Sequence, residues 1–447
     1  MDAGVAAPGP AVAAPPPAGP PAPGAYGPPP GTVPMVYQAY PGGPQQVYYV
    51  PAQGTHAHAT AGVLEGLEST LRNLCATDKL EGFSLKELFK ETFRKRGADA
   101  VEEYMGVGTP RTTPPLEVVD TNWPKPWMFF RVLAGLAVAY AAYYAVVVFS
   151  QNSIPMPAIM VLATFAVPIA TLVLIWEFNT PRNVSVIETI NVLVVGGAIS
   201  VLIITLWYLV PPFNNVPLPG IVEETSKLLS VVIVMYLVRG ARYPYQLNGI
   251  VFGAAVGAGY ACSETLGYGM NSYSGFLVDF VRNGGLNQLI QAHGGSVQIS
   301  VVFLEPLKSM IQELNMRALW SPFGHVVWTA IAAGGFWRVK GDRPINVSML
   351  IDGRFLRAFI FPVVMHEVWD LNVVFPNLSN TVMNCIYAVD GVIAYYILFT
   401  MVQQGLHQVR DMQKAQLEHT LAHVQATMQP VPVVGTYAMQ PQGPAGV

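Results

Sequence analysis

Residues 219–230 read Pro-Gly-Ile-Val-Glu-Glu-Thr-Ser-Lys-Leu-Leu-Ser and begin an apolar segment that continues to Val238. The segment is long enough to cross a bilayer, which takes roughly twenty residues. It nevertheless carries Glu223, Glu224 and Lys227 in its first turns, where each ionised group costs about 2.5–3.5 kcal/mol at mid-bilayer. On a helix Lys227 lies three or four residues from each glutamate, so either carboxylate can pair with it. The cluster therefore indicates either an interfacial salt bridge or a functional site.

The composition is that of a membrane protein. Of the 447 residues, 52% are hydrophobic and only 11% are charged, whereas about a quarter of the residues of a soluble domain are charged. The net charge of −3 gives no indication of nucleic-acid binding. Cys75, Cys262 and Cys385 are too far apart for a zinc-ribbon or CxxC pattern. We therefore predict an all-α, polytopic membrane protein without a cysteine metal site.

The chain divides by composition into five parts. Residues 1–62 are rich in Pro, Gly and Ala, which predicts a disordered segment that acts as a spacer or binds a Pro-rich-motif reader. Residues 63–120 regain charge, and Ser84 and Glu87 have the spacing of a capping box, which indicates a small helical cytosolic region. The remaining parts are a transmembrane domain at 121–402, an amphipathic helix at 403–428 and a disordered tail at 429–447.

About eight hydrophobic segments predict membrane helices. They lie near 127–149, 156–177, 187–210, 218–238, 247–269, 319–338, 354–372 and 381–402. Alternate connections carry the basic residues Arg182, Arg239, Arg242, Arg338, Lys340 and Arg343, whereas 150–155, 211–217 and 373–380 carry none. Cytosolic loops are enriched in Lys and Arg, so both termini are predicted to be cytosolic. The long fifth connection is the exception, because it carries Arg282, Lys308 and Arg317, but long loops cross a membrane largely regardless of charge. Its residues 297–316 predict an amphipathic or re-entrant helix.

With this topology, the ionisable residues of four helices share one level near the extracytosolic side. They are Glu223, Glu224 and Lys227 on the fourth helix, Glu264 on the fifth, His325 on the sixth, and His366 and Asp370 on the seventh. Unrelated surface salt bridges have no reason to share a depth, so one convergent site is the simplest explanation. Asp390, in the middle of the eighth helix, is a weaker candidate for the same cavity.

The residue types fit hydrolytic chemistry. Asp370 follows His366 at i+4, so the carboxylate can orient the imidazole. Two histidines and a glutamate match the ligands of a catalytic zinc with one open position, and a second glutamate can serve as general base. Without a metal, a glutamate whose pKa is raised by its neighbour can activate water while a histidine stabilises the oxyanion. Both mechanisms remain open from the sequence.

Four motifs resemble those of the PrsW family of intramembrane proteases. Glu223-Glu224-Thr-Ser-Lys227 is similar to its EExxK motif. Residues 248–264 resemble the second motif, a Gly-rich helix that ends in Glu264; its glycines at 249, 253, 257 and 259 also predict close approach of a neighbouring helix or a substrate. His325-Val-Val-Trp-Thr-Ala is similar to the third motif, and His366-Glu-Val-Trp-Asp370 to the fourth. The matched region runs from about 215 to 375, in the family's order.

The resemblance implies an endopeptidase that cleaves a membrane-anchored protein near the extracytosolic side. In bacterial members the implied substrate is an anti-sigma factor, which receives its first cut there. The sequence departs from the family at Thr265, where Asn is common. The more distantly related CAAX prenyl proteases and Abi group carry an Arg at a shifted spacing where Lys227 stands, which argues against prenylated substrates.

The family's functional residues map onto the same set. The resemblance implies Glu223 or Glu224 as general base, supported by Lys227, and His325 and His366 as ligands of a zinc ion or as oxyanion stabilisers. Glu264 is a further ligand or proton carrier, and Asp370 orients His366. Three alternative functions are kept: a CAAX-type prenyl-protein endopeptidase, a proton-coupled transporter, which places acids nearer the midplane, and an inactive membrane scaffold.

Overall fold

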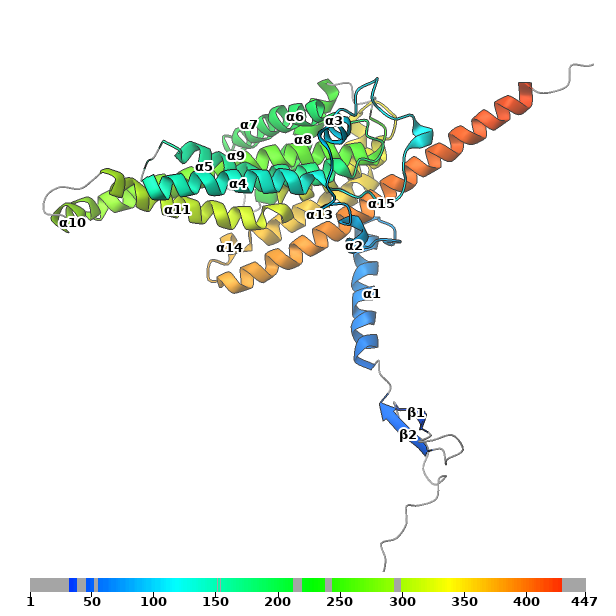
Figure 1. The fold of residues 1–447 in the computed structure, drawn as a ribbon, viewed down its shortest axis with the longest axis horizontal. Coiled ribbons are helices and arrows are strands. Elements are labelled where there is room, and N and C mark those ends of the chain that lie inside the picture. The colour runs from blue at the N-terminus through cyan, green and yellow to red at the C-terminus, as the bar shows by residue number, and fades with distance from the viewer. Residues whose placement is uncertain are drawn as a thin grey trace, which may run out of the picture. The chain divides into compact units, whose positions relative to one another are not determined.

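A computed structural model describes residues 32–37, 46–51, 55–150, 152, 154–211, 219–237, 243–292 and 299–427. The chain divides into two units, Met1–Thr70 and Leu71–Val447. The first holds an antiparallel hairpin of β1 (Thr32–Tyr37) and β2 (Gln46–Pro51), followed by the beginning of α1 (Thr55–Cys75) (Figure 1). These elements lie within the segment predicted to be disordered, where the aromatic and β-branched run of β2 favours a strand. The rest of that segment and the predicted tail at 429–447 lie outside the described residues.

The second unit is a bundle of helices (Figure 1). Its first part holds three short elements, α2 (Leu85–Leu88), α3 (Ala98–Met105) and η1 (Leu116–Val118). The long helices are α4 (Met128–Ser150), α5 (Met156–Glu177), α7 (Gly197–Tyr208), α8 (Pro219–Leu237), α9 (Gln246–Arg282), α11 (Ile299–Trp320), α12 (His325–Lys340), α13 (Gly353–Trp369) and α15 (Asn380–Thr427). The short helices are α6 (Val186–Asn191), the π-helix η2 (Val192–Gly196), α10 (Gly285–Ala292), η5 (Ser321–Phe323), η6 (Val347–Ile351) and α14 (Leu371–Val374).

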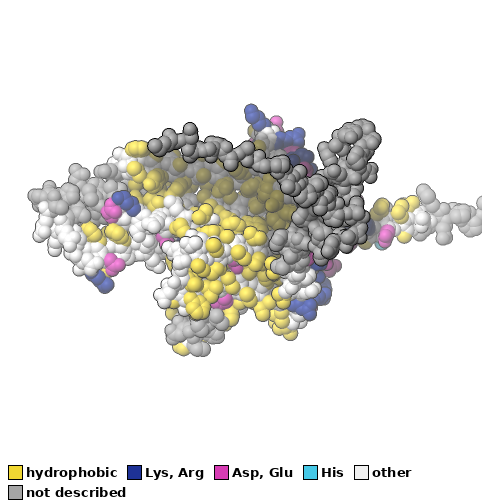
Figure 2. Space-filling view, turned by 90° about the horizontal axis from the view of Figure 1, so that it is seen from below, with side chains coloured by type: hydrophobic (Ala, Val, Ile, Leu, Met, Phe, Trp, Pro, Cys, Tyr) yellow, Lys and Arg dark blue, Asp and Glu magenta, His cyan; other side chains and the backbone are white. Residues whose placement is uncertain are grey.

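The fold is that of an integral membrane protein. Within the described residues, four helical stretches are long and apolar enough to cross a membrane: α4, α5, the run from α6 to α7, and α15. Figure 2 shows a broad hydrophobic surface on the flank of the bundle. Helices also occupy the other four predicted segments, as α8, α9, α12 and α13, but each of these is too short or too polar to be counted with the first four. These four helices carry the ionisable residues of the predicted site.

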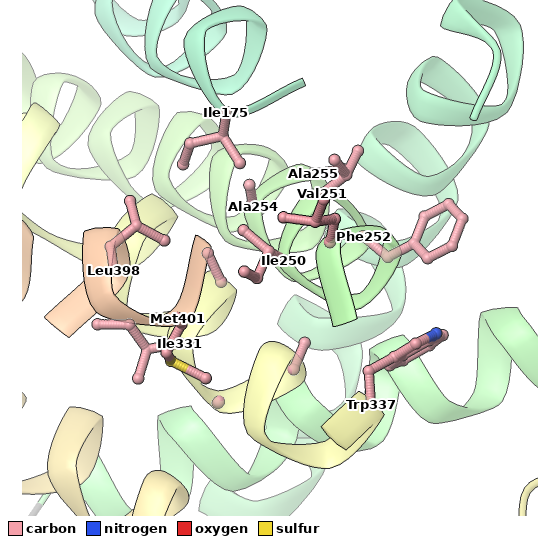
Figure 3. Close-up of a cluster of buried hydrophobic side chains, with 14 of the residues drawn as sticks. Ile175, Ile250, Val251, Phe252, Ala254, Ala255, Ile331, Trp337, Leu398 and Met401 are labelled. Atoms are coloured by element: carbon pink, nitrogen blue, oxygen red, sulfur yellow. The ribbon is translucent and has the colours of Figure 1, made fainter. Parts of the chain in front are cut away.

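The helix pair α9 and α12 forms the centre of the bundle. Ile250 and Phe252 of α9, Ile331 and Trp337 of α12, and Met401 of α15 are buried in one hydrophobic cluster (Figure 3). Three glycines spaced four residues apart let the backbones of α9 and α12 approach closely. A Cβ atom built on one of them, Gly253, would lie 2.2 Å from the Thr329 carbonyl oxygen of α12. Close helix packing therefore explains the glycine spacing.

Replacing Gly253 with alanine is expected to lower the free energy of unfolding by about 1–3 kcal/mol, because the added methyl group overlaps a backbone carbonyl that cannot move aside. The matched control is Gly267→Ala on the same helix, where nothing lies within 4 Å of the built Cβ atom. That change should be neutral or slightly stabilising, because alanine favours helix more than glycine. Unfolding in mixed micelles measures both; equal stability of the two variants would contradict the packing argument.

Several predicted boundaries are wrong. The sixth segment was predicted from 319, but α12 begins at His325, because residues 321–323 form a separate 3₁₀ turn that contains a proline. The fifth helix, α9, does not end near 269 and continues to Arg282. The segment at 297–316 is helical, as predicted, within α11.

The last two predicted elements form one helix. α15 runs unbroken through the predicted boundary at 402, because polar side chains beyond it bind the chain upstream of α4. Gln403 accepts a hydrogen bond from the Glu81 N–H at 2.7 Å, and Gln413 donates to the Leu116 carbonyl at 2.8 Å. In that upstream region the predicted cap is present, since the Ser84 hydroxyl accepts the Glu87 N–H.

Candidate active site

Four helices of the bundle each contribute charged or imidazole side chains to one buried cluster. α8 supplies Glu223, Glu224 and Lys227 from adjacent turns, and α9 supplies Glu264. His325 is the first residue of α12, and the pair His366 and Asp370 stands where α13 ends. The structure brings these seven residues into a continuous chain of contacts. Helix packing thus joins parts of the sequence that lie up to 147 positions apart.

Lys227 lies at the centre of this cluster and is fully buried. Its Nζ atom donates a hydrogen bond to Glu224 Oε1 at 2.7 Å and lies 3.5 Å from Glu223 Oε2. It also lies 2.8 Å from His325 Nδ1 and 4.4 Å from the ring centroid of Tyr260. A buried ion pair keeps its charge only when its partners offset the lost hydration. The lysine therefore holds the two adjacent carboxylates of α8 together within the bundle.

Each histidine has a carboxylate on one ring nitrogen. His366 Nδ1 lies 2.9 Å from Glu224 Oε1, and His325 Nε2 lies 3.0 Å from Glu264 Oε2. A neutral imidazole that donates from one nitrogen presents a lone pair at the other. These contacts favour the tautomers that present a lone pair at His366 Nε2 and at His325 Nδ1, the second of which also lies 2.8 Å from Lys227 Nζ. Metal-bound histidines typically show this arrangement, with a carboxylate on the other ring nitrogen.

Glu223, His325 and His366 form a possible metal site. One ligand atom from each lies within 4.8 Å of the others. Glu223 Oε2 is buried and has no hydrogen-bond partner among the described residues, as expected of an oxygen that takes up a cation. Two imidazoles and one carboxylate are a ligand set of catalytic zinc. The site residues therefore fit a divalent metal. Glu223 and the two histidines are placed to bind it, and Glu264 contacts the ring nitrogen of His325 on the other side.

Three neighbours of the site were missed by the sequence analysis. Arg317 of α11 donates to Glu264 Oε2 at 2.6 Å and to the Thr265 hydroxyl at 3.3 Å. Its side chain fixes the carboxylate that contacts His325, and Thr265, the departure from the family motif, takes part in that support. Trp328 packs against the imidazoles of both His325 and His366, at centroid distances of 5.3 Å and 4.9 Å. Tyr260 lies edge-on to His325 at 5.0 Å.

The two remaining acids occupy different places. Asp370 Oδ2 lies 3.5 Å from His366 Nε2, and its side chain is 29% exposed, so it reaches the more open side of the cluster. Asp390 of α15 is buried, and both of its oxygens lack hydrogen-bond partners among the described residues. Its carboxyl group interacts with Trp328 and with the charge of His366, so it lies close to the cluster. Glu367, beside His366, instead accepts the Ile221 N–H at the start of α8 and fixes that helix.

Buried acids and histidines within a helical membrane bundle define a membrane-embedded hydrolase of the metallopeptidase class. The comparisons identify the family. The profile of the PrsW family intramembrane metalloproteases matches residues 156–402. This match covers more than half of the chain and all seven residues of the cluster, and the chain belongs to this family. Comparison with curated proteins and with solved structures gave no match.

Proposed function

We propose that this intramembrane protease cleaves a membrane-anchored protein near the extracytosolic side of the bilayer, in the manner of a first, site-1-like cut. The observation that supports this proposal best is the buried cluster of Glu223, His325 and His366, which combines a ligand set for zinc with adjacent acids. In a bacterial member of the family the substrate would be a protein such as an anti-sigma factor. A substrate with a single span can present its chain to such a site from within the bilayer.

Glu223 Oε2, His325 Nδ1 and His366 Nε2 would hold the metal, for which zinc is the best candidate. When bound, zinc polarises the scissile carbonyl and lowers the pKa of a coordinated water. Lys227 Nζ contacts the same Nδ1 atom of His325 at 2.8 Å. Coordination there requires that the lysine keep Glu224 as its main partner, so Lys227 neutralises the acid that does not bind the ion.

Glu224 is the proposed general base. Its Oε1 atom contacts Lys227 and His366, whereas its Oε2 atom is buried and has no hydrogen-bond partner among the described residues. That oxygen is free to accept a proton from the attacking water, and the carboxylate can later deliver the proton to the amine that leaves. Glu264 would orient His325, and Asp370, at the more exposed side, would steady His366 when substrate enters.

The full-length protein in liposomes tests this proposal against a library of single-span substrates. We expect wild type to cleave within or close to the outer end of the substrate span. A chelator should abolish cleavage and zinc should restore it, because the ligand set requires a metal. Cleavage that is unaffected after chelation has removed the bound metal would contradict the metal mechanism. Cleavage on the opposite side would contradict the proposed depth.

We further propose that all eight helices span the membrane, with both termini in the cytosol. The basic residues Arg182, Arg338 and Arg343 support this topology, while Arg239 and Arg242 lie outside the described residues. A membrane-impermeant maleimide tests it in intact cells. Asn377→Cys, placed in an exposed turn before α15 in a Cys385→Ser background, should label from outside, because the other two cysteines are buried. Labelling only after permeabilisation would overturn the orientation.

A further inference from the structure

A cavity separate from the proposed active site lies where α4 begins and α5 ends. Its volume is about 640 Å³, and its lining includes Arg96, Tyr104, Trp123, Lys125, Thr180 and Arg182. Both α4 and α5 are long and apolar enough to cross a membrane, so these helix ends meet the boundary between hydrocarbon and water. The cavity therefore lies at the level of lipid headgroups.

The polar groups of this cavity that lack partners are groups that donate hydrogen bonds. Arg96 Nε and Thr180 Oγ1 are buried without a hydrogen-bond partner among the described residues. In the same part of the chain, neither Arg182 nor Lys125 makes an ion pair with an acid. A buried donor without an acceptor is costly. This cavity is therefore suited to a ligand that is rich in acceptor oxygens.

The acids that line the cavity are already engaged. Glu177 accepts three backbone N–H groups at the start of α4, each within 2.9 Å, and also the Tyr104 hydroxyl. Burial, followed by the charge of Glu177, raises the pKa of the Tyr104 phenol, so the phenol stays protonated and donates. Glu91 pairs with two arginines, and Asp120 accepts from Asn122. Because Arg96 is one of the two arginines that pair with Glu91, the cations of the cavity left for a ligand are Lys125 and Arg182.

The guanidinium groups of Arg96 and Arg182 lie over aromatic rings. The Arg96 guanidinium lies 4.5 Å from the Trp127 ring centroid, and the Arg182 guanidinium lies 3.8 Å from that of Tyr104. Arg182 also has a φ of +47°, a left-handed conformation that few residues other than glycine adopt. A guanidinium that stacks on a ring can still use its N–H edge, and at Arg182 this edge matches two oxygens of a phosphate, whereas Arg96 already donates to Glu91 at 2.9 Å.

We propose that this cavity binds the phosphate of an anionic phospholipid headgroup. A lipid is favoured over a soluble phosphate ester because Trp123 and Trp127 stand beside the cavity, and tryptophan is enriched at membrane interfaces. Basic pockets at the ends of membrane helices are suited to anionic headgroups. The bound lipid would join the region upstream of α4 to α5. This site is separate from the proteolytic chemistry and does not depend on it.

Native mass spectrometry of the full-length protein in neutral detergent tests the proposal, with phosphatidylglycerol, phosphatidylcholine and glycerol 3-phosphate as the three probes. We expect one phosphatidylglycerol to bind at least tenfold more tightly than phosphatidylcholine. Arg182→Gln should weaken that binding by about tenfold, because a charge-assisted hydrogen bond is lost. Lys125→Gln, at an exposed position where folding is not at risk, should weaken it in the same direction.

The matched control is Arg131→Gln. The Arg131 guanidinium also lies over the Trp127 ring, 4.7 Å from its centroid, but Arg131 does not line the cavity. The Arg131→Gln variant should bind phosphatidylglycerol as tightly as wild type does. Equal binding by all three variants would overturn the site, as would equal binding of the two lipids by wild type. If glycerol 3-phosphate displaces the lipid at matched concentrations, the ligand is a soluble phosphate ester and the lipid assignment is wrong.

Discussion

Glu224→Gln is expected to reduce the cleavage rate by at least about 100-fold while leaving the protein folded. The exchange keeps the shape of the side chain and removes the carboxylate that we propose as general base, and such a base contributes about 10²–10⁴ to a rate. Glu224 also contacts His366 Nδ1. Loss of a residue that hydrogen-bonds to a metal ligand lowers metal affinity by about 10- to 100-fold, so the variant should bind zinc more weakly. Activity should therefore stay low even when zinc saturates the site.

The adjacent acid gives a different expected result. Glu223→Gln should lose bound zinc together with activity, because Glu223 is grouped with both histidines as a ligand. Metal content by mass spectrometry and cleavage in liposomes, measured on the same preparations, separate the two roles. Glu305→Gln on α11 is the control, since its carboxylate is exposed and pairs with the exposed Lys308 on the same helix. If Glu224→Gln loses zinc at saturation while Glu223→Gln retains it, the two assignments are reversed.

Lys227→Met is expected to produce the largest loss of stability, about 3–5 kcal/mol in the free energy of unfolding. Removing one member of a buried ion pair leaves a charge without compensation. In this site Lys227 contacts both glutamates of α8, and Glu224 is as fully buried as the lysine. Methionine fills a similar volume, so the loss reports charge more than packing. Titration with SDS in mixed micelles measures the difference.

Two further variants make this experiment specific. Lys308→Met removes an exposed lysine that pairs with Glu305 on α11, and such surface pairs contribute about 0–1 kcal/mol. Adding Glu224→Gln to Lys227→Met should recover part of the lost stability, because the uncompensated carboxylate is then gone. Unfolding of Lys227→Met at the wild-type midpoint would show that the glutamates do not need the lysine in order to be buried.

The sequence predicted which residues converge, because charges stand out in apolar segments. Glu223, Lys227 and His366 lie on helices whose other residues are mostly apolar, and hydropathy locates such helices without knowledge of their neighbours. The common level of these residues follows from helix direction alone. Helix existence was therefore predictable, while boundaries such as the start of α12 depended on a local turn.

The pairing within the site could not be predicted in the same way. Whether Glu223 or Glu264 is grouped with the histidines depends on how α8 and α9 are each rotated about their axes, which is set by packing of α8 against α13 and of α9 against α12. Arg317 lies on an amphipathic helix that no motif marks. Trp328 in an apolar helix resembles any core aromatic residue until its contacts with two imidazoles are known.

The distribution of apolarity in the bundle has a consequence for biogenesis. Among the described residues, the stretches long and apolar enough to cross a membrane are α4, α5, the run from α6 to α7, and α15, whereas the helices α8, α9, α12 and α13 between them carry the charges of the site. Lys227 emerges from the ribosome about a hundred residues before His325, so it must enter the membrane before this partner exists. We therefore expect α8, α9 and α12 to remain at the insertion machinery until α13 has been synthesised, and the four helices to pack together in the membrane only then. Many variants with substitutions in these four helices should be degraded by cellular quality control before their proteolytic activity can be measured.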